Sequence, residues 1–226
     1  MALERAHASE RMLVGVGAGL SEGGRETGHF HVDKYDIDMI RYAMRKLDPD
    51  VPKGWEPSKR HFDQLKVKPF EVYDKHNCNL LTAAGWAIAL NSKSFLASGA
   101  NTTVWWTAAV GRIGLGSSST TPTYADAALG SITVPSSLTT PNWVLVSTVP
   151  TYTAASGGTG PFFTLAATFA TTAANGPPIL EFATDQGTAN TLSVSPVGVL
   201  VTHGLASPGT KTSAQTWNVT VTLQFT

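Results

Sequence analysis

The chain has 226 residues, of which 42% are hydrophobic, so it is long and apolar enough to bury a substantial core. Charged residues make up only 14% and the formal net charge is zero, which excludes the basic surface typical of nucleic-acid binders. The single cysteine, Cys78, excludes a disulfide within the chain, and no apolar run reaches the ~18 residues that span a bilayer. Residues 1–5 mix acid and base, so we expect no signal peptide and synthesis in the cytoplasm.

The charged residues are concentrated at the front of the chain. Residues 1–78 contain 13 of the 16 lysines and arginines, 13 of the 16 acids and five of the six histidines. Such a break in composition indicates regions with different surroundings. We therefore expect an extended arm over 1–34, a charged attachment region over 35–78 and a β-sandwich domain over 79–226. The charged residues of that last domain are Lys93, Arg112, Asp126, Glu181, Asp185 and Lys211.

Glycine density characterises the start of the chain, with clusters at 15–19 and 22–24. Glycine weakens helices and strands alike, so this composition predicts an extended arm. Ordering a long arm costs about 1–2 kcal/mol per residue, and we expect the arm to be disordered until it binds a partner.

A helix is predicted directly after the arm. Apolar residues recur at helical spacing from Ile37 to Leu47, and either Asp33 or Asp36 can cap the amino end. Aspartate followed by proline at positions 48 and 49 ends the helix.

Two further segments precede the strands. Three prolines between residues 51 and 72 predict irregular chain that wraps over other elements. Residues 79–91 are apolar on all sides, which predicts a buried helix leading into the sandwich.

From residue 103 the chain consists of short segments rich in threonine, valine and aromatic residues, separated by clusters of small and turn-forming residues. The last segment alternates polar and apolar side chains, as a half-buried antiparallel strand does. We predict a mainly β fold, an antiparallel and jelly-roll-like β-sandwich preceded by one or two short helices. The expected strands are 103–115, 143–152, 162–169, 179–183, 191–194, 198–202 and 216–225.

The side of these strands that should face solvent carries hydroxyl groups, where most proteins carry charged side chains. Hydroxyls limit repulsion between packed copies, and a neutral surface favours association, so we expect a homo-oligomer. The alternative is simple drift in composition.

Trp105 and Trp106 adjoin within a predicted strand, so one faces outward. We expect it to serve self-association, with a stacking platform for a sugar as the alternative.

His29, His31 and Asp33 form the best candidate for metal ligands. Two residues apart on an extended segment, these side chains point the same way and could share one ion. The other candidate ligands, His61 and His76, are distant in the sequence, so we favour solvated polar residues and predict no metal site.

No recognised catalytic motif occurs. Neither possible nucleophile, Cys78 with His76 or a serine with His203, lies in a recognised catalytic motif such as G-x-S-x-G. Glu181, Asp185 and Asp126 are the acids available for carboxylate chemistry in the sandwich. We therefore predict a protein that is not an enzyme, with no catalytic residues and no cofactor.

Several segments resemble virion proteins of tailed bacteriophages, especially those that infect actinobacteria. Arg-Ile-Gly-Leu-Gly at 112–116, followed by Tyr-Ala-Asp-Ala-Ala-Leu-Gly at 124–130, is similar to a motif of those proteins. The stretches 168–182 and 209–223 are similar to a strand–turn–strand piece and to their closing strand, and 35–41 resembles their amino-terminal regions. The proline pair at 177–178 departs from the pattern and puts the start of the following strand in doubt.

The resemblance implies a non-enzymatic structural protein of the virion, most simply a capsid decoration or minor capsid protein. A minor tail, fibre or head–tail junction protein, with carbohydrate binding as an option, is the alternative. The expected partners are the major capsid protein or other virion proteins, without nucleic acid or membrane, and a trimer would suit capsid decoration. The candidate contacts to the capsid are Arg41, Arg45, Trp55 and Phe62.

Overall fold

The structure is a computed structural model that describes residues 27–76, 79–82, 85, 111–130, 141–147, 151–153, 162–195 and 199–224. The arm before residue 27, Cys78, Trp105 and Trp106 lie outside these residues, so the predictions made for them stay predictions. The helices are α2 (Ile37–Leu47) and α3 (Lys59–Leu65). The strands are β1 (Thr27–Asp36), β2 (Glu71–His76), β3 (Asn79–Leu81), β4 (Arg112–Gly116), β5 (Trp143–Leu145), β6 (Thr151–Thr153), β7 (Phe162–Phe169), β8 (Ile179–Asp185), β9 (Leu200–Gly209) and β10 (Gln215–Gln224).

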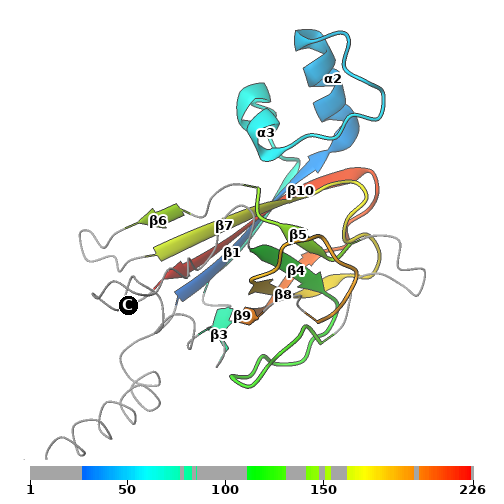
Figure 1. The fold of residues 1–226 in the computed structure, drawn as a ribbon. Coiled ribbons are helices and arrows are strands. Elements are labelled where there is room, and N and C mark those ends of the chain that lie inside the picture. Colours follow the sequence, from blue (N-terminus) through cyan, green and yellow to red (C-terminus); the bar gives the residue numbers. More distant parts are fainter. Residues whose placement is uncertain are drawn as a thin grey trace, which may run out of the picture.

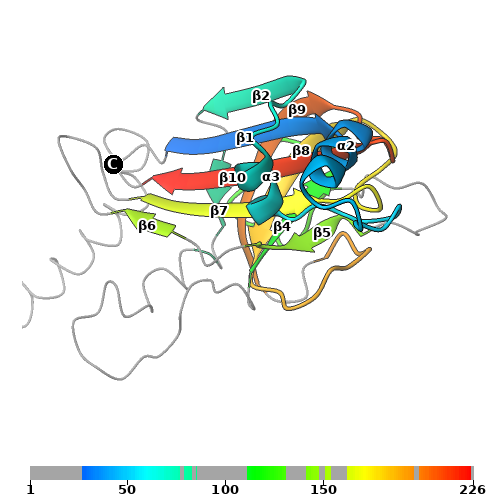
Figure 2. The same ribbon diagram turned by 90° about the horizontal axis from the view of Figure 1, so that it is seen from above.

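The strands form two sheets that face each other (Figures 1 and 2). One sheet, called sheet A, has the order β2-β1-β10-β7-β6, and the other, sheet B, has the order β3-β9-β8-β4-β5. Every strand pair is antiparallel. The predicted mainly β, antiparallel sandwich is therefore confirmed.

Alternating side chains of both sheets build the core between them. Phe30 of β1 and Phe182 of β8 stack with ring centroids 4.2 Å apart, and neither ring is exposed. Trp217 of β10 belongs to the same buried cluster. Aromatic pairs of this kind add to the burial of apolar area, which is the main force holding two sheets together.

The arm predicted for residues 1–34 is wrong in its last part, because residues 27–34 belong to β1. This strand pairs with β10 along its whole length, from Thr27 opposite Gln224 to Asp36 opposite Gln215. The cause is visible in the sequence. Phe30 and Val32 alternate with polar residues and are fully buried, so burial outweighs the effect of the glycines upstream.

Helix α2 has the predicted bounds, and Asp36 is its cap, accepting hydrogen bonds from the backbone N–H groups of Asp38 and Met39. Helix α3 interrupts the segment predicted to be irregular. The predicted helix over 79–91 is wrong at its start, where β3 pairs with β9. Neither α2 nor α3 is long and apolar enough to cross a membrane.

The predicted strands also differ from the observed ones in places. Strand β7 has the predicted bounds, whereas the segment 191–194 contributes only an isolated bridge between Thr191 and Trp143. Strand β9 begins at Leu200 and extends to Gly209, well beyond the predicted end at residue 202.

Residues 37–70, called the α2–α3 projection, stand out from one end of the sandwich (Figure 1). A small core of Tyr35, Ile40 and Phe62 holds them together, with Trp55, Leu65 and Val67 packed against it. The projection leaves sheet A after β1 and returns through β2, its neighbour in the sheet.

Gly114 shows why the glycine of the Arg-Ile-Gly segment is needed. A Cβ atom at this position would lie 2.6 Å from the ring of Trp143, which is fully buried. The guanidinium of Arg112 lies over the same ring, 4.9 Å from its centroid. The glycine therefore leaves room for a buried cation–π contact.

Gly114→Ala is predicted to destabilise the protein by about 1–3 kcal/mol, because the buried indole has no space to retreat. Gly54→Ala is the matched control, since a Cβ there would meet no atom within 4 Å. Its free energy of unfolding should stay within about 0.5 kcal/mol of the wild type. Urea denaturation measures both, and equal values for the two variants would contradict this account of Gly114.

Candidate functional site

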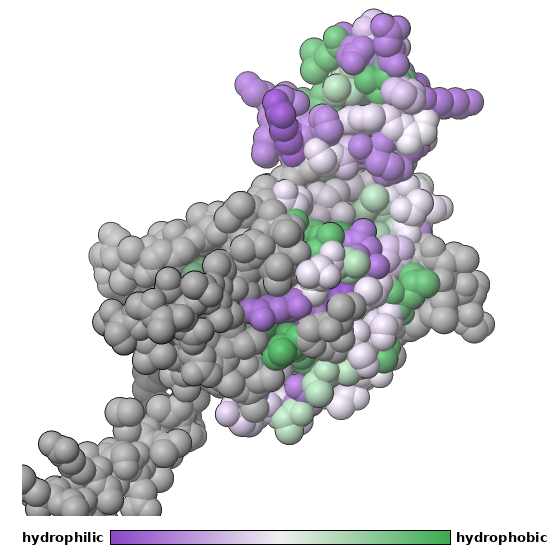
Figure 3. Space-filling model, in the orientation of Figure 1, coloured by the Kyte–Doolittle hydropathy of each residue, from purple (hydrophilic) through white to green (hydrophobic). Residues whose placement is uncertain are grey.

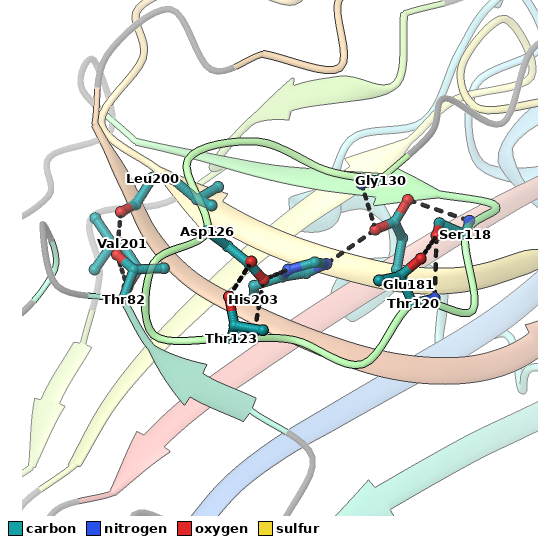
Figure 4. A network of polar contacts seen from close by, with 10 residues as sticks. All are labelled: Thr82, Ser118, Thr120, Thr123, Asp126, Gly130, Glu181, Leu200, Val201 and His203. Atoms are coloured by element: carbon teal, nitrogen blue, oxygen red, sulfur yellow. Dashed lines mark hydrogen bonds and ion pairs between the residues drawn. The ribbon is translucent and has the colours of Figure 1, made fainter.

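A buried histidine lies between two carboxylates in sheet B (Figure 4). His203 of β9 contacts Glu181 of β8 through Nε2 at 2.9 Å and Asp126 through Nδ1 at 2.6 Å. Glu181 is fully buried and the side chain of His203 is only 3% exposed. Buried charges are tolerated when they are paired in this way.

The loop after β4 closes over this pair of strands (Figure 4). Glu181 accepts hydrogen bonds from the backbone N–H of Ser118 at 3.2 Å and of Gly130 at 2.8 Å. Asp126 accepts bonds from both the backbone and the hydroxyl of Thr123. Each acid thus fixes one part of the loop, and the network fastens residues 117–130 to the sheet.

The network perturbs the titration of its members. Burial alone would lower the pKa of His203, but the hydrogen bonds to Glu181 and Asp126, and their negative charges, raise it above its ordinary value. Burial acts to raise the pKa of Asp126, but its hydrogen bonds with Thr123 and His203 lower it overall. The folded protein therefore stabilises the imidazolium form of His203 relative to a free histidine.

This arrangement does not form a nucleophilic triad. The hydroxyl of Ser118 donates to Thr120 at 2.9 Å, and both ring nitrogens of His203 are engaged by carboxylates. A general base must instead present a nitrogen to the hydroxyl that it deprotonates. The geometry fits a structural clamp.

A second buried ion pair lies nearby. Arg112 of β4 donates through Nε to Asp185 of β8 at 2.9 Å and also through Nη2, and neither side chain is exposed. Its Nη1 donates to the carbonyl of Ala189 at 2.8 Å and to the hydroxyl of Thr191 at 2.9 Å. The bidentate pair thereby holds the segment after β8 against the sheet.

Residues predicted to contact the capsid have different places on the α2–α3 projection. Phe62 is only 5% exposed, in the small core, so its predicted partner contact is wrong. Arg41 donates to the carbonyl of Trp55 and to Glu56, both at 3.0 Å. Arg45 is exposed and its predicted contact stays a prediction.

Glu56 links the projection to the sandwich. Besides Arg41, it accepts a hydrogen bond of 2.6 Å from the hydroxyl of Thr171, which follows β7. Nearby, the buried ammonium of Lys211 donates to the carbonyl of Ala170 at 2.6 Å. Burial lowers the pKa of Lys211 to about 7, although the negative charge of Glu56 acts to raise it. Arg41, Glu56 and Lys211, at the base of the projection, thus all make contacts within the chain.

Two apolar side chains on the outer face of α2 have no such internal role: Met39 and Tyr42, three residues apart, are 61% and 62% exposed. Leu47, the last residue of the helix, is 69% exposed. The ammonium of Lys46 lies over the ring of Tyr42, 4.6 Å from its centroid. Figure 3 shows apolar patches among hydrophilic side chains on the projection. Exposed apolar residues rimmed by charges are typical of a surface that binds another protein.

Comparisons with known proteins give no identification: no protein-family model, no curated protein and no solved structure matches this chain.

His203→Gln is predicted to destabilise the protein by about 3–5 kcal/mol near pH 6, because it leaves the buried Glu181 without its cationic partner. The contribution of His203 is complete below its unfolded pKa of 6.5, and it is lost as the pH rises through its higher folded-state pKa. The stability gap between wild type and variant should therefore narrow above pH 6.5.

Urea denaturation from pH 5 to pH 9 measures this gap. Lys211 contributes the opposite trend, because from about pH 7 to its ordinary pKa of 10.5 the folded state gives up a proton that the unfolded chain keeps. Comparing wild type with variant cancels that contribution. His76→Gln, with a side chain 70% exposed, is the control and should change the free energy of unfolding little at any pH. A gap independent of pH would refute the charged clamp.

Proposed function

We propose that the chain is a non-enzymatic structural protein of a phage virion, which attaches to a partner protein of the particle through the α2–α3 projection. Decoration or stabilisation of the capsid is the role we favour. The sandwich then supplies the outer surface and the contacts between copies.

The observation that carries the proposal is the set of exposed apolar side chains on α2. Three of the seven large hydrophobic side chains exposed in the described part of the chain, Met39, Tyr42 and Leu47, lie on this one helix. The small core around Phe62 is complete without them. Met39 and Tyr42 face solvent, so they add little to the packing of the isolated chain. Their burial against a partner would stabilise the complex.

The charge distribution supports the same attachment surface. Asp38, Arg45 and Lys46 are exposed on the same helix, and the ammonium of Lys46 lies over the ring of Tyr42. A polar rim around an apolar centre gives an interface both affinity and a defined orientation. Resemblance to virion proteins supplies the class of partner, the major capsid protein or a neighbour of it.

The segments that resemble phage virion proteins have structural roles here, and such roles suit a protein without catalytic activity. Arg112 and Asp185 form a buried ion pair, and Asp126 and Glu181 hold His203. These are the acids considered for catalysis, and each is engaged by Arg112 or His203.

A carbohydrate-binding tail protein is the second candidate, and a small groove favours it. The groove has a volume of about 100 Å³ and lies between the outer face of sheet A and α3. Polar side chains line it beside the rings of Tyr35 and Phe62, so the groove offers hydrogen-bonding groups and aromatic surface to part of a sugar. These residues are Asp33, Tyr35, Asp63, Thr168, Asn218 and Thr220, beside Phe62, Ala166 and Ala167.

Purified particles of the phage that encodes this chain test the proposal directly. Mass spectrometry is expected to find the chain in many copies per particle, and cryo-electron microscopy is expected to place it on the capsid with α2 facing the shell. Location on the tail would favour the second candidate. Absence from the particle would overturn both.

Tyr42→Ser tests the binding surface itself. Particles assembled without the chain should bind this variant at least about tenfold more weakly than the wild type, because truncating a central aromatic residue commonly removes about 2 kcal/mol. Tyr124→Ser is the matched control, since Tyr124 is 57% exposed and lies on the loop over sheet B. Both variants should keep the wild-type melting temperature. Equal affinities for the two variants would exclude α2 from the interface.

A further inference from the structure

We infer that the chain binds a divalent transition-metal ion, of which Zn²⁺ is the natural probe, between β1 and β2 through His29, His31 and Asp74. This site is independent of the proposed attachment surface, and it revises the prediction that the chain has no metal site.

The two strands bring the ligands together from distant parts of the sequence. In the antiparallel register His31 lies opposite Asp74, and His29 lies opposite His76. Side chains two residues apart on a strand share a face, so all four are on the outer side of sheet A. The neighbouring Phe30 and Val32 face the core and are fully buried.

The donor atoms converge on one point. One ligand atom each from His29, His31 and Asp74 lies within 4.8 Å of the others. His31 Nδ1 is 3.3 Å from Asp74 Oδ1, and His29 Nε2 contacts the same oxygen. Zinc–nitrogen bonds of about 2.0–2.1 Å place tetrahedral donors roughly 3.4 Å apart, so small side-chain movements suffice to admit an ion.

A second carboxylate orients one ligand. His31 Nε2 lies 3.0 Å from Asp33 Oδ1, on the opposite side of the ring from Asp74. Histidines that bind a metal through one nitrogen usually donate the other N–H to a carboxylate, which fixes the ring and makes the ligand more basic. Asp33 is therefore a positioning residue.

His76 completes the surroundings of the site. Its ring stacks on that of His29, with centroids 4.3 Å apart and planes 6° apart, and its Nε2 is 3.7 Å from Asp74 Oδ2. Imidazole and carboxylate donors together suit zinc, nickel and copper better than calcium or magnesium. Three protein ligands on a solvent-facing surface leave the fourth position to water.

An ion here would fasten an outer strand. β2 is at the edge of sheet A, and none of its residues is fully buried. Its attachment depends on the ladder with β1, so a bond from each strand to one ion would add a cross-link where packing is weakest.

Isothermal titration of the full chain with Zn²⁺, together with the visible spectrum of the Co²⁺ form, tests the inference. The protein should carry no affinity tag, and His7→Ala and Cys78→Ser should be present throughout, because these two possible ligands lie outside the described residues. We expect one saturable site and the intense absorption of tetrahedral Co²⁺.

Single substitutions assign the ligands. His29→Asn, His31→Asn and Asp74→Asn should each weaken Zn²⁺ binding by more than about 100-fold, and Asp33→Asn by roughly 10–100-fold, as expected for a positioning carboxylate. His61→Asn, which changes a histidine on α3, should bind like the parent protein. Zn²⁺ should also raise the melting temperature of the parent and of the His61 variant, but not of the His31 variant.

Melting temperatures in EDTA show whether each variant folds. If a histidine variant fails to fold, Asp74→Asn still tests the site, because asparagine keeps the shape of the aspartate side chain. Absence of saturable binding would overturn the inference, as would equal affinity in the His29, His31 and His61 variants. Either result would leave the cluster as hydrogen-bonded histidines and would not affect the virion proposal.

Discussion

Antiparallel pairing between β1 and β10 joins the front of the chain to its end along the whole of β1. Phe30 and Val32 enter the core through this pairing, beside Val219 and Val221 of β10. It also fixes where the α2–α3 projection leaves the sandwich and which face of the sheet carries His29 and His31. A one-residue slip would turn Phe30 and Val32 to solvent and bring the histidines inside, so burial of these apolar side chains specifies the register.

Most charged side chains described after residue 79 are inside the sandwich. Arg112, Glu181, Asp185 and Lys211 are fully buried, and Asp126 is hydrogen-bonded to the buried His203. In this part of the chain the few charges are therefore used mainly in internal contacts. The ion pairs do not simply add stability, because desolvation offsets much of their attraction. They connect loops to strands at defined points, and this is how Glu181 holds both Ser118 and Gly130.

Sequence patterns predicted the elements whose signals are local. Alternation identified β10, helical spacing with Asp36 and Pro49 identified α2, and the bounds of β7 followed from its aromatic and threonine content. β1 was missed because the glycines before it outweighed a short alternating stretch.

Long-range partners were not accessible in this way. Asp126, Glu181 and His203 are 22 to 77 positions apart, and each looks unremarkable alone. Likewise His29 and His31 were recognised as a pair, but Asp74 joins them only through the register of β1 with β2. On α2, spacing separated the apolar and polar faces but could not reveal that Arg41 would be used internally by Trp55 and Glu56.

The place where the α2–α3 projection is inserted has a consequence for how such a chain can diversify. Its two ends meet across one ladder, with Lys34 opposite Glu71 and the N–H of Phe70 donating to the carbonyl of Lys34. Because neighbouring strands already hold these ends together, the ladder itself does not fix the length of what lies between them. A replacement insert would lose the bond between Glu56 and Thr171 but would still start and end at the same two strands, so we expect both sheets to keep their alignment when a foreign peptide is grafted there.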